Sequence, residues 1–153
     1  MTIRPLQKED QEELLAMMRV FYDSPALIHK TSTRALQRDI DACLDRENPF
    51  VEAWIFTSKD GKEIQGYAMI SKSYTTEYGG LCIWVEDLYI KPAYRHSGMS
   101  KEFFAYIERA YPEAVRFKLE VEEENEHAIQ AYQKSGYAIS DYYLMTKEMD
   151  PDL

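Results

Sequence analysis

The sequence predicts a single α+β domain over residues 1–153, with a mixed, mostly antiparallel sheet flanked by four helices. The 153 residues fit one domain by the usual range of about 100–200 residues per domain. Strand-type and helix-type hydrophobic patterns follow one another in the order β-α-α-β-β-β-α-β-α-β-β. Neither an internal repeat nor a low-complexity tract or linker divides the sequence.

The first expected elements are a short strand over residues 2–6 and a helix after it. Asp10, with Glu13 three residues later, resembles a capping box, which marks the start of a helix. Apolar residues then recur at helical spacing. The sequence Asp-Ser-Pro at residues 23–25 is expected to end this helix.

A second helix and a hairpin are expected next. The helix covers residues 33–45, and its apolar stripe includes Cys43, which is therefore expected in the core rather than as a nucleophile. Two strand-type segments follow, over residues 50–57 and 64–74. The Asp60-Gly61 turn between them predicts an antiparallel hairpin.

The segment 81–90 is apolar almost throughout, as expected for a central strand that is covered on both faces. Glu86 and Asp87 are the two acidic residues in it. Because they are adjacent, a regular strand would point them to opposite faces, and a bulge would alter that arrangement. Pro92 ends the strand.

The last third of the chain is expected to hold two helices and three strands. One helix follows the sequence R-H-S-G-M-S and ends before Pro112, and residues 115–121 alternate like a strand with one buried face. Asn125 is suited to cap a second helix, which Gly136 ends in a left-handed conformation. Two short strands are expected to close the chain, over residues 137–139 and 142–147.

The charge balance excludes some classes of partner. There are 18 basic and 27 acidic residues, a formal net charge of −9. This balance argues against nucleic-acid binding through a basic face and against binding to an anionic membrane surface. Cationic partners stay open, although an acidic balance most often reflects solubility alone.

Cysteine and histidine usage predicts neither a disulfide framework nor a metal site. The two cysteines form no C-x-x-C motif, and the three histidines are scattered along the sequence. No apolar run approaches the roughly 20 residues that cross a bilayer, and the N-terminal residues do not resemble a signal peptide. We therefore expect a cytoplasmic protein with reduced thiols.

The most informative segment is the junction between the apolar strand and R-H-S-G-M-S. A helix N-terminus offers unpaired backbone N–H groups, a glycine admits a close ligand, and Arg95 is suited to phosphate oxygens. The junction is equally compatible with a tight strand-to-helix turn that carries an exposed arginine. It matches neither the P-loop nor the G-x-G-x-x-G pattern of dinucleotide sites.

Two motifs here resemble those of the GNAT superfamily of acyl-CoA-dependent N-acyltransferases. The family signature Q/R-x-x-G-x-G/A corresponds to Arg95, Gly98 and Ser100. About thirty residues later the family has an Asn that opens a helix, followed by Ala, a tyrosine and Gly. That second signature corresponds to Asn125, Ala128, Ala131-Tyr132 and Gly136-Tyr137.

The resemblance covers essentially the whole chain, and W-V-E-D-L-Y-I with the later A-Y-Q-K-S-G-Y looks like the diamine (spermidine/spermine) N-acetyltransferase branch. Ser100 departs from the Gly or Ala that the family prefers. His96 stands where the family often has Gly, so a positive φ at this position would be strained.

The resemblance implies acetyl-CoA as co-substrate and no metal. In the family the pantetheine arm pairs with the central strand, the pyrophosphate lies on the amides before the next helix, and a backbone N–H at Ile90 polarises the acyl carbonyl. Residues of the last helix flank the arm. These roles correspond to Leu88, Tyr89, Ile90, Arg95, His96, Ser97, Gly98, Met99, Ser100, Lys101, Asn125, Ala128 and Tyr132.

The reaction sets requirements on two further side chains. An alkylamine with a pKa of about 10.4 is almost fully protonated at pH 7, which costs about 4.6 kcal/mol unless a base in the site removes the proton. Glu86 is the candidate base, because a carboxylate in an apolar strand has reason for a raised pKa; the alternative is a buried partner for Arg or Lys. Tyr132 is the candidate acid for the departing thiolate, although a packed aromatic residue fits it as well.

The acceptor is expected to be a primary amine on a small cationic molecule such as a polyamine or diamine, attacking directly through a tetrahedral intermediate. Glu86 and Asp87 are candidates for binding this cation. Tyr22, Asp23, Glu52 and Glu77 are further candidates, although a solvated surface position fits each of these four better. Alternatives are acetylation of protein lysines or N-termini, a catalytically silent acyl-CoA-binding module, and an acidic scaffold for basic proteins. A homodimer is expected from the resemblance only.

Overall fold

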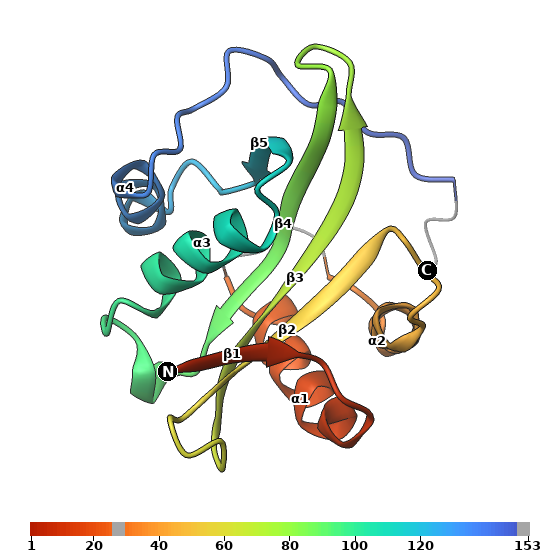
Figure 1. Cartoon of the computed structure of the whole chain (residues 1–153), viewed down its shortest axis with the longest axis vertical. Helices are drawn as coiled ribbons and strands as arrows, with labels where there is room; N and C mark the ends of the chain where they lie inside the picture. Colours follow the sequence, from red (N-terminus) through yellow and green to blue (C-terminus); the bar gives the residue numbers. More distant parts are fainter. Residues whose placement is uncertain (26–29, 150–153) are drawn as a thin grey trace.

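The computed structural model describes residues 1–25 and 30–149 and contains one five-stranded sheet with four α-helices (Figure 1). The strands lie in chain order across the sheet. The first four run antiparallel to their neighbours, and the fifth runs parallel to the fourth. The strands are β1 (Thr2–Pro5), β2 (Val51–Thr57), β3 (Ile64–Thr75), β4 (Gly80–Ile90) and β5 (Ala114–Leu119).

The helices are divided between the two faces of the sheet. The core residues of the first two helices pack with side chains from β2, β3 and β4, and those of the third helix pack with the alternate side chains of the same strands. The predicted mixed, mostly antiparallel sheet with four helices is therefore confirmed. The helices are α1 (Gln11–Tyr22), α2 (Thr33–Leu44), α3 (Met99–Ala110) and α4 (Glu126–Lys134).

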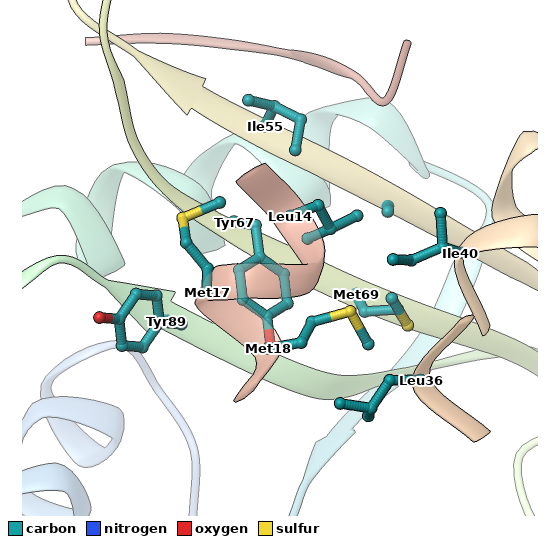
Figure 2. Close-up of a cluster of buried hydrophobic side chains, with 10 residues drawn as sticks. Leu14, Met17, Met18, Leu36, Ile40, Ile55, Tyr67, Met69 and Tyr89 are labelled. Carbon is teal, nitrogen blue, oxygen red and sulfur yellow. The ribbon is translucent and has the colours of Figure 1, made fainter. Parts of the chain in front are cut away.

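One core lies between the sheet and the helices α1 and α2 (Figure 2). Tyr67 of β3 is its largest member and is fully buried, together with Leu14 and Met18 of α1. Cys43 packs at the edge of this core, as predicted, and burial raises the pKa of its thiol to about 12. A thiol with so high a pKa is a poor nucleophile at neutral pH.

The second core lies between the sheet and α3. Phe103, Phe104 and Ile107 of α3 are fully or almost fully buried against Phe56 and Ile70 of the sheet. Phe56 and Phe103 have ring centroids 5.4 Å apart. Burial of such a side chain contributes about 2 kcal/mol, so this packing fixes α3, and with it the loop before α3, against β4.

The start of α1 differs from the expected capping box. Asp10 is 6% exposed and forms a paired contact with the Arg4 guanidinium, at 2.6 and 2.9 Å. Asp10 also accepts a hydrogen bond from the backbone N–H of Gln7, and it ends a short 3₁₀ turn over Lys8–Asp10. The carboxylate therefore joins β1 to the turn and caps no N–H of α1.

The prediction of two strands over residues 137–139 and 142–147 is wrong. The structure shows no strand after α4 in the described residues, and residues 138–149 are exposed. Figure 1 shows this segment as an irregular trace that leads away from α4. The sequence of residues 137–147 has strand propensity. A strand also needs a hydrogen-bonding partner, and the local sequence does not supply one.

None of the helices in residues 1–25 and 30–149 is long and apolar enough to cross a membrane.

Gly66 is required where β3 and β4 approach closely. A Cβ atom at this position would lie 2.3 Å from the carbonyl oxygen of Tyr89 and 3.1 Å from the Cα atom of Ile90. We predict that Gly66→Ala lowers the free energy of unfolding by about 3 kcal/mol, because backbone atoms must move to admit the methyl group. Urea unfolding measures the change.

Ser73→Ala is the matched control, because Ser73 lies on the exposed part of the same strand. Its free energy of unfolding should stay within about 0.5 kcal/mol of the parent protein. Equal stability of Gly66→Ala and the parent would contradict the close approach.

Candidate active site

A pocket opens where β4 and β5 diverge. The two strands are paired from Leu81 with Ala114 to Val85 with Leu119, and no pairing continues beyond these residues. The opening has a volume of about 510 Å³. Its four main walls are the second half of β4, the loop before α3, the connector after β5 and the first turns of α4. Residues at the end of α1 and just after it, among them Phe21 and Pro25, also line it.

The β4 wall offers backbone hydrogen-bonding groups to the pocket. Lys91 donates to the carbonyl of Gln65, which fixes the register of the β3–β4 ladder. In this register Tyr89 and Tyr67 form a hydrogen-bonded pair, so the N–H and C=O groups of Leu88 and Ile90 point away from β3. They point toward the opening that β5 leaves, where an extended ligand could add to the strand edge.

Arg95 lies on the wall next to this strand. Its Nε atom donates to the carbonyl oxygen of Ile90 at 2.9 Å, and its guanidinium lies 5.8 Å from the centroid of the Tyr89 ring. The carbonyl of Ile90 therefore already has a donor. The N–H of Ile90 and the remaining guanidinium donors are the groups on this wall that suit a ligand's carbonyl or phosphate oxygens.

The loop before α3 has the backbone geometry of an open cradle. Gly98 has a φ of 83°, and no atom lies within 4 Å of the position that a Cβ would take. His96 has a φ of 60°, so the strain expected at this position is present. Met99 is buried, which leaves its backbone N–H but not its side chain for a ligand at the start of α3.

The fourth wall is the start of α4. The Asn125 side chain accepts a hydrogen bond from the N–H of Ala128, as an N-cap residue does. Tyr132 lies two turns further on, packed edge-to-face on Phe104 with ring centroids 5.7 Å apart. Burial raises the pKa of Tyr132, so its hydroxyl is protonated at neutral pH. Among the residues that the structure describes, none accepts a hydrogen bond from this hydroxyl.

A bulge in β4 decides the positions of the two acidic residues. Asp87 pairs with Met69 and Val85 with Ile70, so Glu86 is an extra residue between two consecutive pairs. Glu86 is exposed, lines the pocket and accepts a hydrogen bond from the Ser71 hydroxyl. The expectation of a buried carboxylate in this strand holds for Asp87, which is 2% exposed, and not for Glu86.

Asp87 is fully engaged by two phenols. Tyr22 of α1 donates to its Oδ1 atom at 2.7 Å, and Tyr67 of β3 donates to its Oδ2 atom at 2.9 Å. Burial raises the pKa of Asp87 to about 6, even though both hydrogen bonds favour the charged form. The geometry therefore favours a role in fixing α1 to the sheet over direct contact with an acceptor.

Asp39 of α2 is an acidic neighbour that the sequence analysis did not single out. Burial raises the pKa of Asp39. The nearby charge of Arg38 lowers this pKa, and that of Glu86 raises it. Burial raises the pKa of Tyr22 most, and the charges of Asp87, Asp39 and Glu86 raise it further. Asp39 lies on a helix far from β4 in the sequence, so no local pattern indicated it.

The structure brings most of the predicted site residues together, and their roles stay predictions. Tyr22 lies behind the bulge, and Asp23 ends α1 on the surface. Ser97, Gly98, Met99 and Lys101 surround the start of α3 without lining the pocket. The predicted residues that line it are Glu86, Leu88, Tyr89, Ile90, Arg95, His96, Ser100, Asn125, Ala128 and Tyr132.

Two other acidic candidates lie outside the pocket. Glu52 is paired with Lys72 at 2.5 Å and accepts a hydrogen bond from Tyr111, and Glu77 is paired with Arg116 at 2.9 Å. His127, one of the three histidines that the sequence scatters without metal-binding spacing, is part of the pocket wall. No group of three or more metal-binding side chains occurs in the described part of the chain.

The chain matches known proteins in its family and in its fold. The model of the Acetyltransferase (GNAT) family matches residues 11–137, which include all four walls of the pocket. A search of curated protein sequences returned no match. Several solved structures share the fold over almost the whole chain.

Three of these structures illustrate the likeness. A possible acetyltransferase from Clostridium difficile 630 has a TM-score of 0.82 at 20% identity, over 97% of each chain. AAC(6')-Iy, solved with the bisubstrate analogue CoA-S-monomethyl-acetylneamine, has a TM-score of 0.77 at 15% identity, over 97% of this chain and 98% of that one. A transcriptional regulator from Bacillus halodurans C-125 has a TM-score of 0.75 at 21% identity, over 96% and 99%.

At these identities the solved structures establish a common fold, and the family model establishes the relationship. That model covers more than four fifths of the sequence. The diverging strands and the open loop before α3 are consistent with it. The chain therefore belongs to the Acetyltransferase (GNAT) family, and it is an acetyl-CoA-dependent N-acetyltransferase.

Proposed function

We propose that this acetyltransferase acts on a primary amine of a small cationic molecule, of the polyamine or diamine type. The observation that carries the proposal is the bulge, which exposes Glu86 on the pocket wall. Asp39 and Asp87 add carboxylates near Glu86, as their influence on Tyr22 indicates. A cluster of carboxylates beside a pocket favours a ligand with positive charges.

The donor side of the pocket fits acetyl-CoA. The N–H and C=O groups of Leu88 and the N–H of Ile90 suit the amide groups of a pantetheine arm laid along β4. The open backbone around Gly98 and the first N–H groups of α3 suit a pyrophosphate, which the helix dipole also favours. Asn125 and Ala128 lie on the opposite wall, where they would flank the arm.

Glu86 is the proposed base. The acceptor enters as an ammonium ion, and its nitrogen needs a free electron pair to form the new N–C bond. Glu86 accepts a proton from the ammonium nitrogen, directly or through a water molecule, and this frees the electron pair. Ser71 orients the Glu86 carboxylate by hydrogen bonding. Without a base, the scarcity of free amine at pH 7 costs about 4.6 kcal/mol.

Tyr132 is the proposed acid. When the C–S bond breaks, the electron pair stays on sulfur, and the Tyr132 hydroxyl donates a proton to the thiolate. The raised pKa keeps this hydroxyl protonated before the reaction. The N–H of Ile90 is proposed to stabilise the negative charge that develops on the acyl oxygen.

Release of free CoA thiol over a panel of amines tests the proposed acceptor class. We expect amine-dependent release with putrescine and spermidine and little release with neutral amines, because the carboxylates favour cations. Neamine and a lysine peptide extend the panel, since AAC(6')-Iy was solved with a neamine-derived analogue. Acetyl-CoA binding without release for any amine would instead indicate a silent acyl-CoA-binding module.

Glu86→Gln tests the base. We expect turnover at pH 7 to fall about 100-fold, and the deficit to shrink toward pH 10, where free amine becomes abundant. The pH–rate profile with the best amine of the panel measures this. Glu12→Gln, an exposed change on α1, is the control and should leave the profile unchanged. A constant deficit at all pH values would exclude Glu86 as the base.

Tyr132→Phe tests the acid. We expect kcat to fall about 10- to 100-fold with little change in the Kd of acetyl-CoA, because the ring and its packing on Phe104 stay. Tyr137→Phe is the matched control: its ring also packs on Phe104, at 5.1 Å, but it does not line the pocket. Unchanged kcat for Tyr132→Phe would remove Tyr132 from the proton-donating role.

A further inference from the structure

Two carboxylates flank the point where β4 and β5 separate. Val85 and Leu119 are the last residues that the two strands pair, and Glu86 and Glu120 follow them directly. Paired strands lie about 4.8 Å apart, so these two residues start from neighbouring positions on opposite sides of the opening. Both are exposed, and both line the pocket. The register of the last pair therefore creates a carboxylate pair, Glu86 and Glu120, across the opening.

The alternation of β5 directs Glu120 to the face of the sheet opposite α3. Phe117 and Leu119 pack in the core under α3, so Lys118 and Glu120 alternate to the other face. The Lys118 ammonium lies on that face over the Trp84 ring, 5.0 Å from its centroid.

Glu86 lies on the same face as Glu120. It accepts a hydrogen bond from the hydroxyl of Ser71, and Ser71 follows Met69 at the two-residue spacing of one strand face. Met69 packs in the core under α1 and α2. The end of α1 borders the pocket on this side through Phe21. The carboxylate pair therefore belongs to the α1 side of the pocket, across the sheet from α3.

Within the described part of the chain, the carboxylate pair has no cation of the protein as its partner. None of the ion pairs there includes Glu86 or Glu120, and Lys118 lies over the Trp84 ring instead. Like charges on neighbouring strands are destabilising. Glu122 lines the same wall as Glu120, and its Oε1 atom is buried without a hydrogen-bond partner among the described residues. A cationic ligand would offset this excess of negative charge.

Resting on the proposed function, in which the acceptor enters as an ammonium ion, we infer that Glu86 and Glu120 hold the reacting nitrogen between them. A primary ammonium has three N–H groups, so it can donate to both carboxylates. Proton transfer to Glu86 leaves a neutral amine with two N–H groups and a free electron pair. Glu120 still accepts one of these N–H groups, which orients the electron pair for attack. A tertiary ammonium has a single N–H, so the carboxylate pair selects primary amines.

Calorimetry of the full-length protein with desulfo-CoA, which cannot carry an acetyl group, measures amine binding without turnover. We expect Glu120→Gln to weaken the binding of putrescine, neamine and a lysine peptide about tenfold, because a charge-assisted hydrogen bond is lost. Glu123→Gln is the matched control. It removes the same charge from the same connector, but Glu123 is exposed and does not line the pocket. The Kd values of this control should stay within about twofold of the parent values.

Turnover separates the role of Glu120 from that of the base. With the best amine of the panel, Glu120→Gln should raise KM about tenfold and leave kcat within about threefold, with the pH–rate profile of the parent enzyme. Glu120→Asp, which keeps a carboxylate on a shorter side chain, should recover part of the loss in KM. A kcat deficit of Glu120→Gln that shrinks toward pH 10 would make Glu120 the base and would overturn the inference.

The binding measurement also separates this inference from the proposed function. Amine binding that depends on Glu120, without acetylation of any amine, would contradict the proposed reaction and support the carboxylate pair. Unchanged binding in Glu120→Gln, or a loss no larger than that in Glu123→Gln, would overturn the inference. Absence of binding for all three amines to the parent protein would overturn it as well.

Discussion

The divergence of β4 from β5 is the constraint on which the candidate site depends. Parallel pairing ends at Val85 and Leu119, and the next residues of β4 keep β3 as their single ladder partner. The N–H and C=O groups of Leu88 and the N–H of Ile90 are therefore left for another partner, which buried or half-buried backbone groups require. The two cores hold this edge in place: α1 and α2 cover one face of the sheet, and α3 covers the other. The opening is a stable property of the packed domain.

The β4 bulge adds the acidic character of the site. One extra residue reverses which face the following side chains occupy, so Asp87 enters the core beside Tyr67 and Glu86 stays on the pocket wall. Asp87 then joins α1 to the sheet through Tyr22. Burial raises the pKa of Asp87 to about 6, so proton binding by this group favours the native state. From this group alone, stability is greatest below its unfolded pKa, decreases as the pH rises toward 6, and is lower above it.

The net charge of −9 is unevenly distributed around the pocket, where one region favours cations and another favours anions. Carboxylates gather around the bulge, where the proposed cationic acceptor would lie. Arg95 and the N-terminus of α3 lie on the other side of the pocket, where an anion fits. An enzyme that joins a tetra-anionic donor such as acetyl-CoA to a cationic amine needs both regions close together, and the whole-chain charge describes neither of them.

The sequence by itself determined the helices and the first five strands, and it placed the loop around Gly98 at the start of α3, because hydrophobic periodicity and helix-boundary residues are local signals. The prediction of strands over residues 137–139 and 142–147 failed because a strand pairs with a partner strand from elsewhere in the chain. The tertiary structure alone decided that Asp87 rather than Glu86 is buried, that Asp39 lies near them, and that His127 meets His96. These facts depend on a one-residue bulge and on packing between distant segments, which leave no trace in the spacing of neighbouring residues.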